Sequence, residues 1–139
     1  MSSIPKAVRQ QVLSEAEHRC EYCLTSSRLI GMPLVIDHIT PKSLGGEDER
    51  KNLAASCYRC NEFKGAKTQG IDNVTGELTT LFNPRTQVWI ENFKWINGAS
   101  EVVGITPTGR VTVSTLRLNN EYIMATRGIW AARGWHPPY

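Results

Sequence analysis

The chain has 139 residues, of which 40% are hydrophobic and 21% are charged, and its formal net charge is +3. This length is that of one ordinary domain, and the composition excludes a disordered chain. No apolar run approaches the ~20 residues of a membrane helix, and the start, MSSIPKAVRQ, lacks the apolar stretch of a signal peptide. We therefore expect a soluble cytoplasmic protein with no membrane partner.

The first half of the chain predicts helices mixed with a short strand, as in an α+β fold. A helix is predicted from residue 5 to about residue 17, because proline suits a first helical turn and apolar residues recur at helical spacing. Residues 24–33 contain several turn formers and predict a loop. Residues 34–36 predict a short strand that ends at Asp37-His38, and residues 58–67 predict a second helix.

The second half predicts a hairpin followed by helices. The predicted elements are, in chain order, strands at 92–96 and 102–106, a segment of ambiguous pattern at 109–118 and a last helix at 121–133. Asn97-Gly98 is a favoured turn pair and joins the two strands. The ambiguous segment fits both a strand and a helix, and we prefer the helix. Asn120 is expected to cap the last helix, and Gly134 to end it.

Residues 80–139 hold six Lys and Arg against three Asp and Glu, and they contain all four tryptophans. A basic, aromatic-rich segment can bind nucleic acid, with Arg85, Arg110 and Arg117 as possible phosphate contacts. A tryptophan-filled core with solvated charges explains the same composition, and we favour ordinary surface for the arginines. We divide the chain into a core, residues 1–79, and a C-terminal hairpin-plus-helix extension, residues 80–139, expected to pack on that core.

The four cysteines form two matched pairs, Cys20-x2-Cys23 and Cys57-x2-Cys60, separated by 33 residues. In a reducing cytoplasm, such pairs are typical of a metal site. Four sulfurs complete the tetrahedral shell of zinc and leave no position for water, so we expect a structural zinc ion. Two disulfides, a redox CxxC and an iron–sulfur cluster are the alternatives.

The residues between and beside these pairs carry several polar motifs in a fixed order. They are Asp37-His38, Pro41, Ser43, Gly45-Gly46, Asn52-Leu53 and Cys57-x2-Cys60-Asn61-x2-Lys64. This order resembles the HNH endonuclease family, in the Asp-His-Asn-Asn variant that RNA-guided CRISPR nucleases also contain, with Asn61 in place of the third histidine. Three tail segments, LFNPRTQVW, GITPTGR and RGWHPP, resemble an extension found on small stand-alone bacterial HNH proteins.

The resemblance implies a ββα-metal (His-Me finger) core stapled by the four-cysteine zinc site, and a nuclease that hydrolyses phosphodiester bonds of double-stranded DNA. That reaction needs a base for the attacking water and a cation for the departing 3′ oxygen. His38 is the expected base, because a neutral imidazole accepts a proton near pH 7. Asp37 and Asn61 offer hard oxygen ligands for Mg²⁺ or Mn²⁺. The resemblance gives Asn52 the role of orienting the loop around His38.

Two geometric expectations follow from the spacing of these residues. Adjacent residues of a regular strand point to opposite faces, so Asp37 and His38 share a site only if the strand ends or bulges there. We therefore predict irregular backbone at this pair. Lys64 shares a helix face with Asn61 and is a candidate phosphate contact, although an exposed structural lysine is equally consistent. Lys42 is a weaker candidate of the same kind.

Two other functions are compatible with parts of this pattern. One is a non-catalytic, zinc-stabilised module that only binds nucleic acid, and the other is an adaptor whose knuckles support a protein-binding surface. Taken singly, each candidate residue also has an ordinary role as a cap or a loop residue. Neither alternative function needs Asp37, His38 and Asn61 at these positions, so the joint pattern favours the nuclease.

Overall fold

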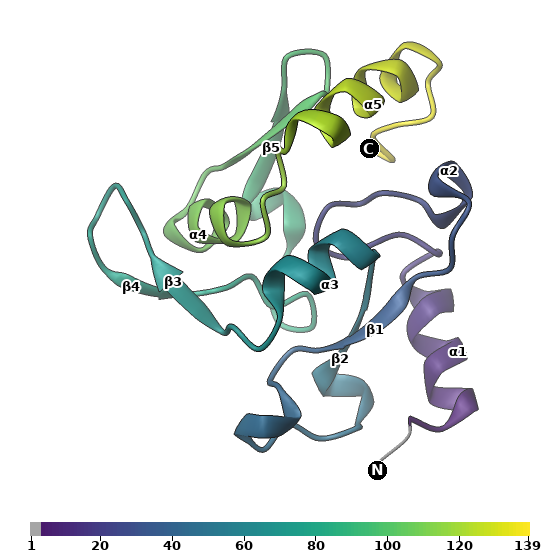
Figure 1. Cartoon of the computed structure of the whole chain (residues 1–139), viewed down its shortest axis with the longest axis vertical. Coiled ribbons are helices and arrows are strands. Elements are labelled where there is room, and N and C mark those ends of the chain that lie inside the picture. Colours follow the sequence, from purple (N-terminus) through teal and green to yellow (C-terminus); the bar gives the residue numbers. More distant parts are fainter. Residues whose placement is uncertain (1–3) are drawn as a thin grey trace. The chain divides into compact units, whose positions relative to one another are not determined.

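The computed structural model describes residues 4–139 (Figure 1). Helices and short two-stranded sheets alternate along the chain, which confirms the mixed helix-and-strand class. Among the described residues, no helix has both the length and the hydrophobicity of a membrane span. The chain divides into two compact units, the first made of residues up to Thr68 with Asn83–Thr86, and the second of Gln69–Phe82 with Gln87–Tyr139. The boundary predicted between residues 79 and 80 falls inside a strand of the second unit.

The first unit contains α1 (Lys6–Glu15), α2 (Ser27–Ile30), β1 (Val35–His38), β2 (Leu53–Ser56) and α3 (Tyr58–Lys64), with 3-10 turns at Lys42–Leu44 and Arg50–Asn52. The two predicted helices are present as α1 and α3. The second ends earlier than predicted, because Gly65 leaves the helical region at a φ of 53°. The loop predicted over 24–33 is wrong in part: it contains α2, where the Ser26 hydroxyl accepts a hydrogen bond from the Arg28 N–H.

The strands β1 and β2 form a regular antiparallel pair, in which Asp37 lies opposite Ala54 and His38 opposite Leu53. The prediction of irregular backbone at Asp37-His38 is therefore wrong, and the strand continues through both residues. Regular alternation turns the two side chains to different surroundings: Asp37 is 4% exposed, whereas His38 is 22% exposed. Every residue of β2 is buried, with α1 packing against β2 and α3 against β1 (Figure 1).

The second unit contains β3 (Gln69–Ile71), β4 (Leu78–Thr80), β5 (Phe93–Ile96), β6 (Glu101–Gly104), α4 (Pro107–Thr115) and α5 (Glu121–Ala132), with a 3-10 turn at Trp89–Glu91. The predicted hairpin is confirmed as β5–β6, and Asn97 and Gly98 both have positive φ in its turn. The preferred helix in the ambiguous segment is confirmed as α4. The cap of α5 is confirmed as well, since the Asn120 side chain accepts a hydrogen bond from the Ile123 N–H.

Two glycines allow α4 to approach β6 closely. A Cβ on Gly104 would lie 2.2 Å from the backbone nitrogen of Arg110, and a Cβ on Gly109 would lie 2.0 Å from the carbonyl oxygen of Asn92. Any side chain at either position would collide with backbone that cannot move aside. The Thr106 hydroxyl begins the helix here by accepting a hydrogen bond from the Gly109 N–H at 3.0 Å. The tail segment GITPTGR is thus explained by packing and capping.

Three of the six cationic side chains of residues 80–139 make internal contacts. Arg110 makes a bidentate ion pair with Asp72, in which Nε donates to Oδ1 at 2.8 Å and Nη2 donates to Oδ2 at 2.9 Å. Arg127 is fully buried, with its guanidinium 5.2 Å from the centre of the Trp95 ring. Arg85, in the segment that belongs to the first unit, pairs with Glu21 there and is 11% exposed. These three of the six cations of residues 80–139 therefore have structural roles, whereas Lys94, Arg117 and Arg133 are exposed.

The β3–β4 hairpin, which the sequence analysis missed, is closed by the buried carboxylate of Asp72. Besides Arg110, this carboxylate accepts hydrogen bonds from the Thr75 hydroxyl at 2.8 Å and from the backbone N–H groups of Val74 and Thr75. The hydrogen bonds from Arg110 hold the pKa of Asp72 well below its usual range. Replacement of this carboxylate should loosen the hairpin from α4, which carries Arg110.

We expect Asp72→Asn to lower the melting temperature near neutral pH, by an amount that depends on pH. The folded-state pKa of Asp72 lies below the unfolded value of about 3.9, so its stabilisation is complete above about pH 5 and declines as the pH falls below about 4. Thermal unfolding from pH 7 to pH 2 should therefore show the wild-type advantage narrowing at acid pH. Glu77→Gln, an exposed neutralisation in the same hairpin, is the control. An advantage that stays constant down to pH 2 would contradict the role of this ion pair.

Candidate active site and metal centre

The four cysteines come together in the first unit from two distant segments. Cys20 and Cys23 follow α1, while Cys57 and Cys60 lie at the start of α3. All four thiols are buried and free, and their Sγ atoms lie within 4.8 Å of one another. The Sγ atoms of Cys23 and Cys57 are 3.7 Å apart, close to the edge of about 3.8 Å in a tetrahedron with Zn–S bonds near 2.3 Å. The cluster can therefore hold a metal ion such as zinc.

The electrostatic surroundings of the cluster suit thiolates bound to a cation. Burial raises the pKa of the Cys20 thiol well above its usual range, a cost that a bound cation offsets. The sulfur of Cys57 accepts the Cys60 N–H at 3.4 Å, and Arg59 donates to the sulfur of Cys23 at 3.5 Å. These donors stabilise negative charge on sulfur. The donor set and the spacing both fit a four-thiolate site.

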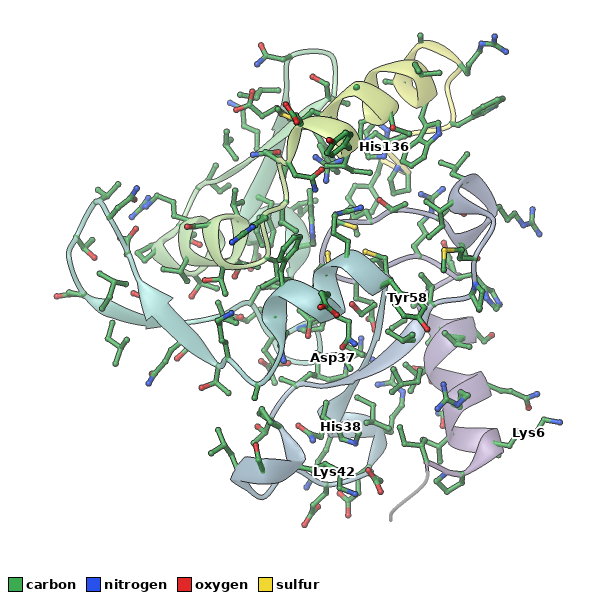
Figure 2. The ribbon with its side chains drawn as sticks, in the orientation of Figure 1. Lys6, Asp37, His38, Lys42, Tyr58 and His136 are labelled. Atoms are coloured by element: carbon green, nitrogen blue, oxygen red, sulfur yellow. The ribbon has the colours of Figure 1, made fainter. Side chains whose placement is uncertain are left out.

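Four of the predicted site residues line one open hollow of about 290 Å³ beside β1. The hollow is bounded by Ile36, Asp37, His38, Pro41, Lys42, Asn61, Gly65 and Ala66. Asp37 and His38 come from β1, Asn61 comes from α3, and Lys42 comes from the loop after β1. Although the regular strand separates Asp37 from His38, the structure still brings them to the wall of the same hollow. Figure 2 labels Asp37, His38 and Lys42 along this side of the first unit.

The Asp37 carboxylate is held from two directions. The Tyr22 hydroxyl donates to Oδ2 at 2.6 Å, and the Lys64 ammonium lies 3.2 Å from Oδ1 and 3.1 Å from Oδ2. Burial raises the pKa of Asp37 above its ordinary value, while Lys64 and Tyr22 act in the opposite direction. The carboxylate is thus fixed in position before any ligand arrives.

Lys64 is 2% exposed, so the alternative of an exposed structural lysine is wrong. Besides Asp37, its ammonium donates to the carbonyl oxygens of His38 at 3.2 Å and Ile39 at 3.4 Å. Its position three residues after Asn61, at the end of α3, aims it at β1. The Lys64 ammonium therefore holds the end of β1, and a phosphate could contact it only in competition with these hydrogen bonds.

Asn52 ties both ends of the loop after β1 together. Its Oδ1 accepts the Thr40 N–H at 2.8 Å, and its Nδ2 donates to the carbonyl oxygens of Thr40 at 3.0 Å and Glu47 at 2.9 Å. Its own carbonyl accepts the Ile39 N–H. A Cβ on Gly46 would lie 1.7 Å from the Thr40 oxygen, so the second glycine of the Gly-Gly pair is required for this closure. Asn52 therefore shapes the loop and does not line the hollow.

His38 has a partner that the sequence analysis did not identify. Its Nε2 lies 2.7 Å from Oδ1 of Asp48, and the other carboxylate oxygen of Asp48 accepts a hydrogen bond from Lys42 at 3.1 Å. Lys42 is 44% exposed, whereas His38 and Asp48 are each 22% exposed. The sequence feature that could have identified Asp48 is its place two positions after Gly46, in a loop that must turn back toward β2.

The comparisons with known proteins agree with this site. Residues 20–67 match the sequence model of the HNH endonuclease family, and this segment contains the four cysteines and every predicted site residue. The CRISPR-associated endonuclease Cas9 of Corynebacterium diphtheriae is 29% identical in an alignment 114 residues long, which covers 62% of this chain and 10% of that protein. The chain thus spans about a tenth of the length of this relative. No solved structure shows a significant match. The predicted resemblance of this segment to HNH endonucleases is confirmed.

We expect Lys64→Met to destabilise the protein by about 3–5 kcal/mol, because it leaves the buried Asp37 carboxylate without its cation. Urea unfolding followed by circular dichroism measures the loss. Lys67→Met is the matched control, since Lys67 is exposed on the same segment, and it should change the free energy of unfolding by no more than about 0.5 kcal/mol. Adding Asp37→Asn to Lys64→Met should recover part of the loss. Equal effects of the two lysine variants would show that the ion pair is unimportant.

Proposed function

We propose that the first unit is a metal-dependent endonuclease that hydrolyses phosphodiester bonds of double-stranded DNA. The observation that carries the proposal is the convergence of Asp37, His38 and Asn61 on one open hollow within a segment that matches the HNH endonuclease family. A protein that only binds nucleic acid or protein has no use for a base and two oxygen ligands at one solvent-accessible wall. The similarity to a protein named an endonuclease supports the same function.

In this proposal, β1, β2 and α3 are the ββα-metal core of the nuclease. The two antiparallel strands are followed directly by the helix, and α3 packs against β1. The strand supplies Asp37 and His38, and the helix supplies Asn61. Rigid elements on both sides of the hollow hold these groups more firmly than loops would.

Asp37 and Asn61 are the residues that would hold a divalent ion, because a carboxylate and an amide oxygen suit Mg²⁺ or Mn²⁺. When bound, the ion supplies a positive charge for the phosphate and the departing 3′ oxygen. The two oxygens of Asp37 offer about four acceptor sites, and the contacts with Tyr22 and Lys64 occupy most of them. We therefore expect weak metal binding by the protein alone, because the ion competes with Lys64.

His38 is the general base of the proposed reaction. Its imidazole is partly exposed at the hollow and can accept a proton from a water molecule that enters there. Asn52 keeps the loop beside His38 closed through its hydrogen bonds to Thr40 and Glu47. Lys42 is an exposed cation on the rim and is the proposed phosphate contact in preference to the buried Lys64.

The four cysteines hold a structural zinc ion in this proposal. Their sulfurs fill a tetrahedral shell, so the ion has no position for water or substrate. It joins the segment after α1 to the first turn of α3, the helix that carries Asn61. The zinc thereby supports the catalytic hollow without taking part in the reaction.

The proposed activity is tested by incubating the purified protein with supercoiled plasmid, with Mg²⁺, with Mn²⁺ and with EDTA. We expect divalent-ion-dependent cleavage, and a loss of about 10²–10⁴-fold in the cleavage rate for His38→Ala, which removes the base. Added imidazole should restore part of the activity of His38→Ala, because the hollow is open to solvent. Unchanged melting temperature and metal content provide the folding control. Failure of the wild type to cut with either ion, or undiminished cutting by His38→Ala, would refute the mechanism.

Metal analysis tests the zinc site separately. We expect about one zinc ion per chain in the wild type, and Cys57→Ser should lose that ion together with much of the thermal stability, because binding of structural zinc contributes directly to the free energy of folding. Chelation of the wild type should lower its melting temperature in the same way, and added zinc should restore it. A Cys57→Ser protein that melts at the wild-type temperature would contradict the assignment.

A further inference from the structure

The contact between His38 and Asp48 constrains the chemistry of the imidazole. The two atoms that meet are Nε2 and a carboxylate oxygen, 2.7 Å apart, and both side chains are mostly shielded from solvent. An ionised carboxylate only accepts hydrogen bonds, so Nε2 must carry a hydrogen. In a neutral imidazole, Nδ1 is then the atom with the available lone pair.

The backbone around Asp48 is fixed by the bonds that close the loop. The carbonyl of the preceding residue, Glu47, accepts the Nδ2 hydrogen bond of Asn52, and the Gly46 N–H donates to the carbonyl of Pro41. On its other side, the Asp48 carboxylate is held by Lys42 at 3.1 Å. Asp48 therefore has little freedom to turn away from His38, and Asn52 acts on the histidine through this neighbour.

We propose that Asp48 is a positioning residue that holds His38 in the tautomer protonated at Nε2, so that Nδ1 is the atom that takes the proton from the attacking water. This inference rests on the proposed nuclease function of the same hollow. In the step, the proton leaves the water oxygen and binds Nδ1, and the imidazole becomes positively charged. Asp48 stays ionised and stabilises that charge through the Nε2 hydrogen bond.

Lys42 completes a chain of three groups, in which the carboxylate of Asp48 bridges an ammonium and an imidazole. A carboxylate with one oxygen bound to Lys42 presents its other oxygen to Nε2 in a defined direction.

The tautomer of His38 is measured directly by long-range ¹H–¹⁵N correlation spectra of the ¹⁵N-labelled protein, at a pH where the imidazole is neutral. The wild type should show hydrogen on Nε2. In Asp48→Asn the amide can also donate to Nε2, so a substantial population with hydrogen on Nδ1 should appear. Asp48→Glu, which keeps the carboxylate, should retain more of the wild-type tautomer. Glu49→Gln is the control, because Glu49 is exposed and pairs only with Lys51 among the contacts described.

Plasmid cleavage provides the second measurement. Asp48→Asn should lower kcat about tenfold or more, since it alters the state of the base, whereas a change in KM reports on Lys42, the proposed phosphate contact, which loses its carboxylate partner. A wild-type tautomer together with wild-type kcat in Asp48→Asn would overturn the inference, even if His38→Ala is inactive and the nuclease function stands. If the wild type cuts no DNA, the proposed function fails, and the spectra still decide whether Asp48 fixes the ring.

Discussion

The pairing of β1 with β2 is the constraint on which the candidate site depends. Because the ladder is regular through His38, it sends two chemically different neighbours to two different surroundings. Asp37 enters a buried setting of Tyr22 and Lys64, where its carboxylate is fixed. His38 meets the loop after the strand, where its Nε2 lies 2.7 Å from the carboxylate of Asp48. The alternation thus separates the proposed metal ligand from the proposed base by backbone geometry, while both stay at one wall of the hollow.

Burial of the Asp37–Lys64 ion pair costs desolvation free energy. Two charges that are 4% and 2% exposed lose much of their hydration, and apolar side chains of similar size often give equal or better stability. A carboxylate that is needed as a ligand for a cation must nevertheless stay ionised inside the protein. Lys64 meets that need by holding the carboxylate in place and by bonding to the carbonyls of His38 and Ile39. The ion pair thus costs desolvation free energy but fixes the position of the Asp37 carboxylate, which agrees with the proposed role of Asp37 as a metal ligand.

Features set by short-range chemistry could be predicted from the sequence, whereas features set by long-range packing could not. The Asn120 cap, the Asn97-Gly98 turn and the grouping of the four cysteines follow from residue type and spacing. The regularity of β1 depends on its pairing with β2, which residue propensity does not encode. The β3–β4 hairpin was missed because it is held by Asp72 and Arg110, which lie 38 positions apart in the chain. Asp48 was missed for the same reason, since its role exists only once the loop closes.

A positive net charge supports nucleic-acid binding only where the basic side chains that produce it are exposed and unpaired. The excess of cations in residues 80–139 suggested a nucleic-acid surface, yet Arg85, Arg110 and Arg127 are engaged in ion pairs or buried against Trp95. A guanidinium that already neutralises a carboxylate releases no counterion from DNA, so it adds little to affinity or to salt dependence. Lys94, Arg117 and Arg133 are the exposed cations of this stretch. In the proposed nuclease, the exposed cations of residues 80–139 that could attract DNA are therefore these three, and recognition of the scissile phosphate is assigned to the hollow in the first unit.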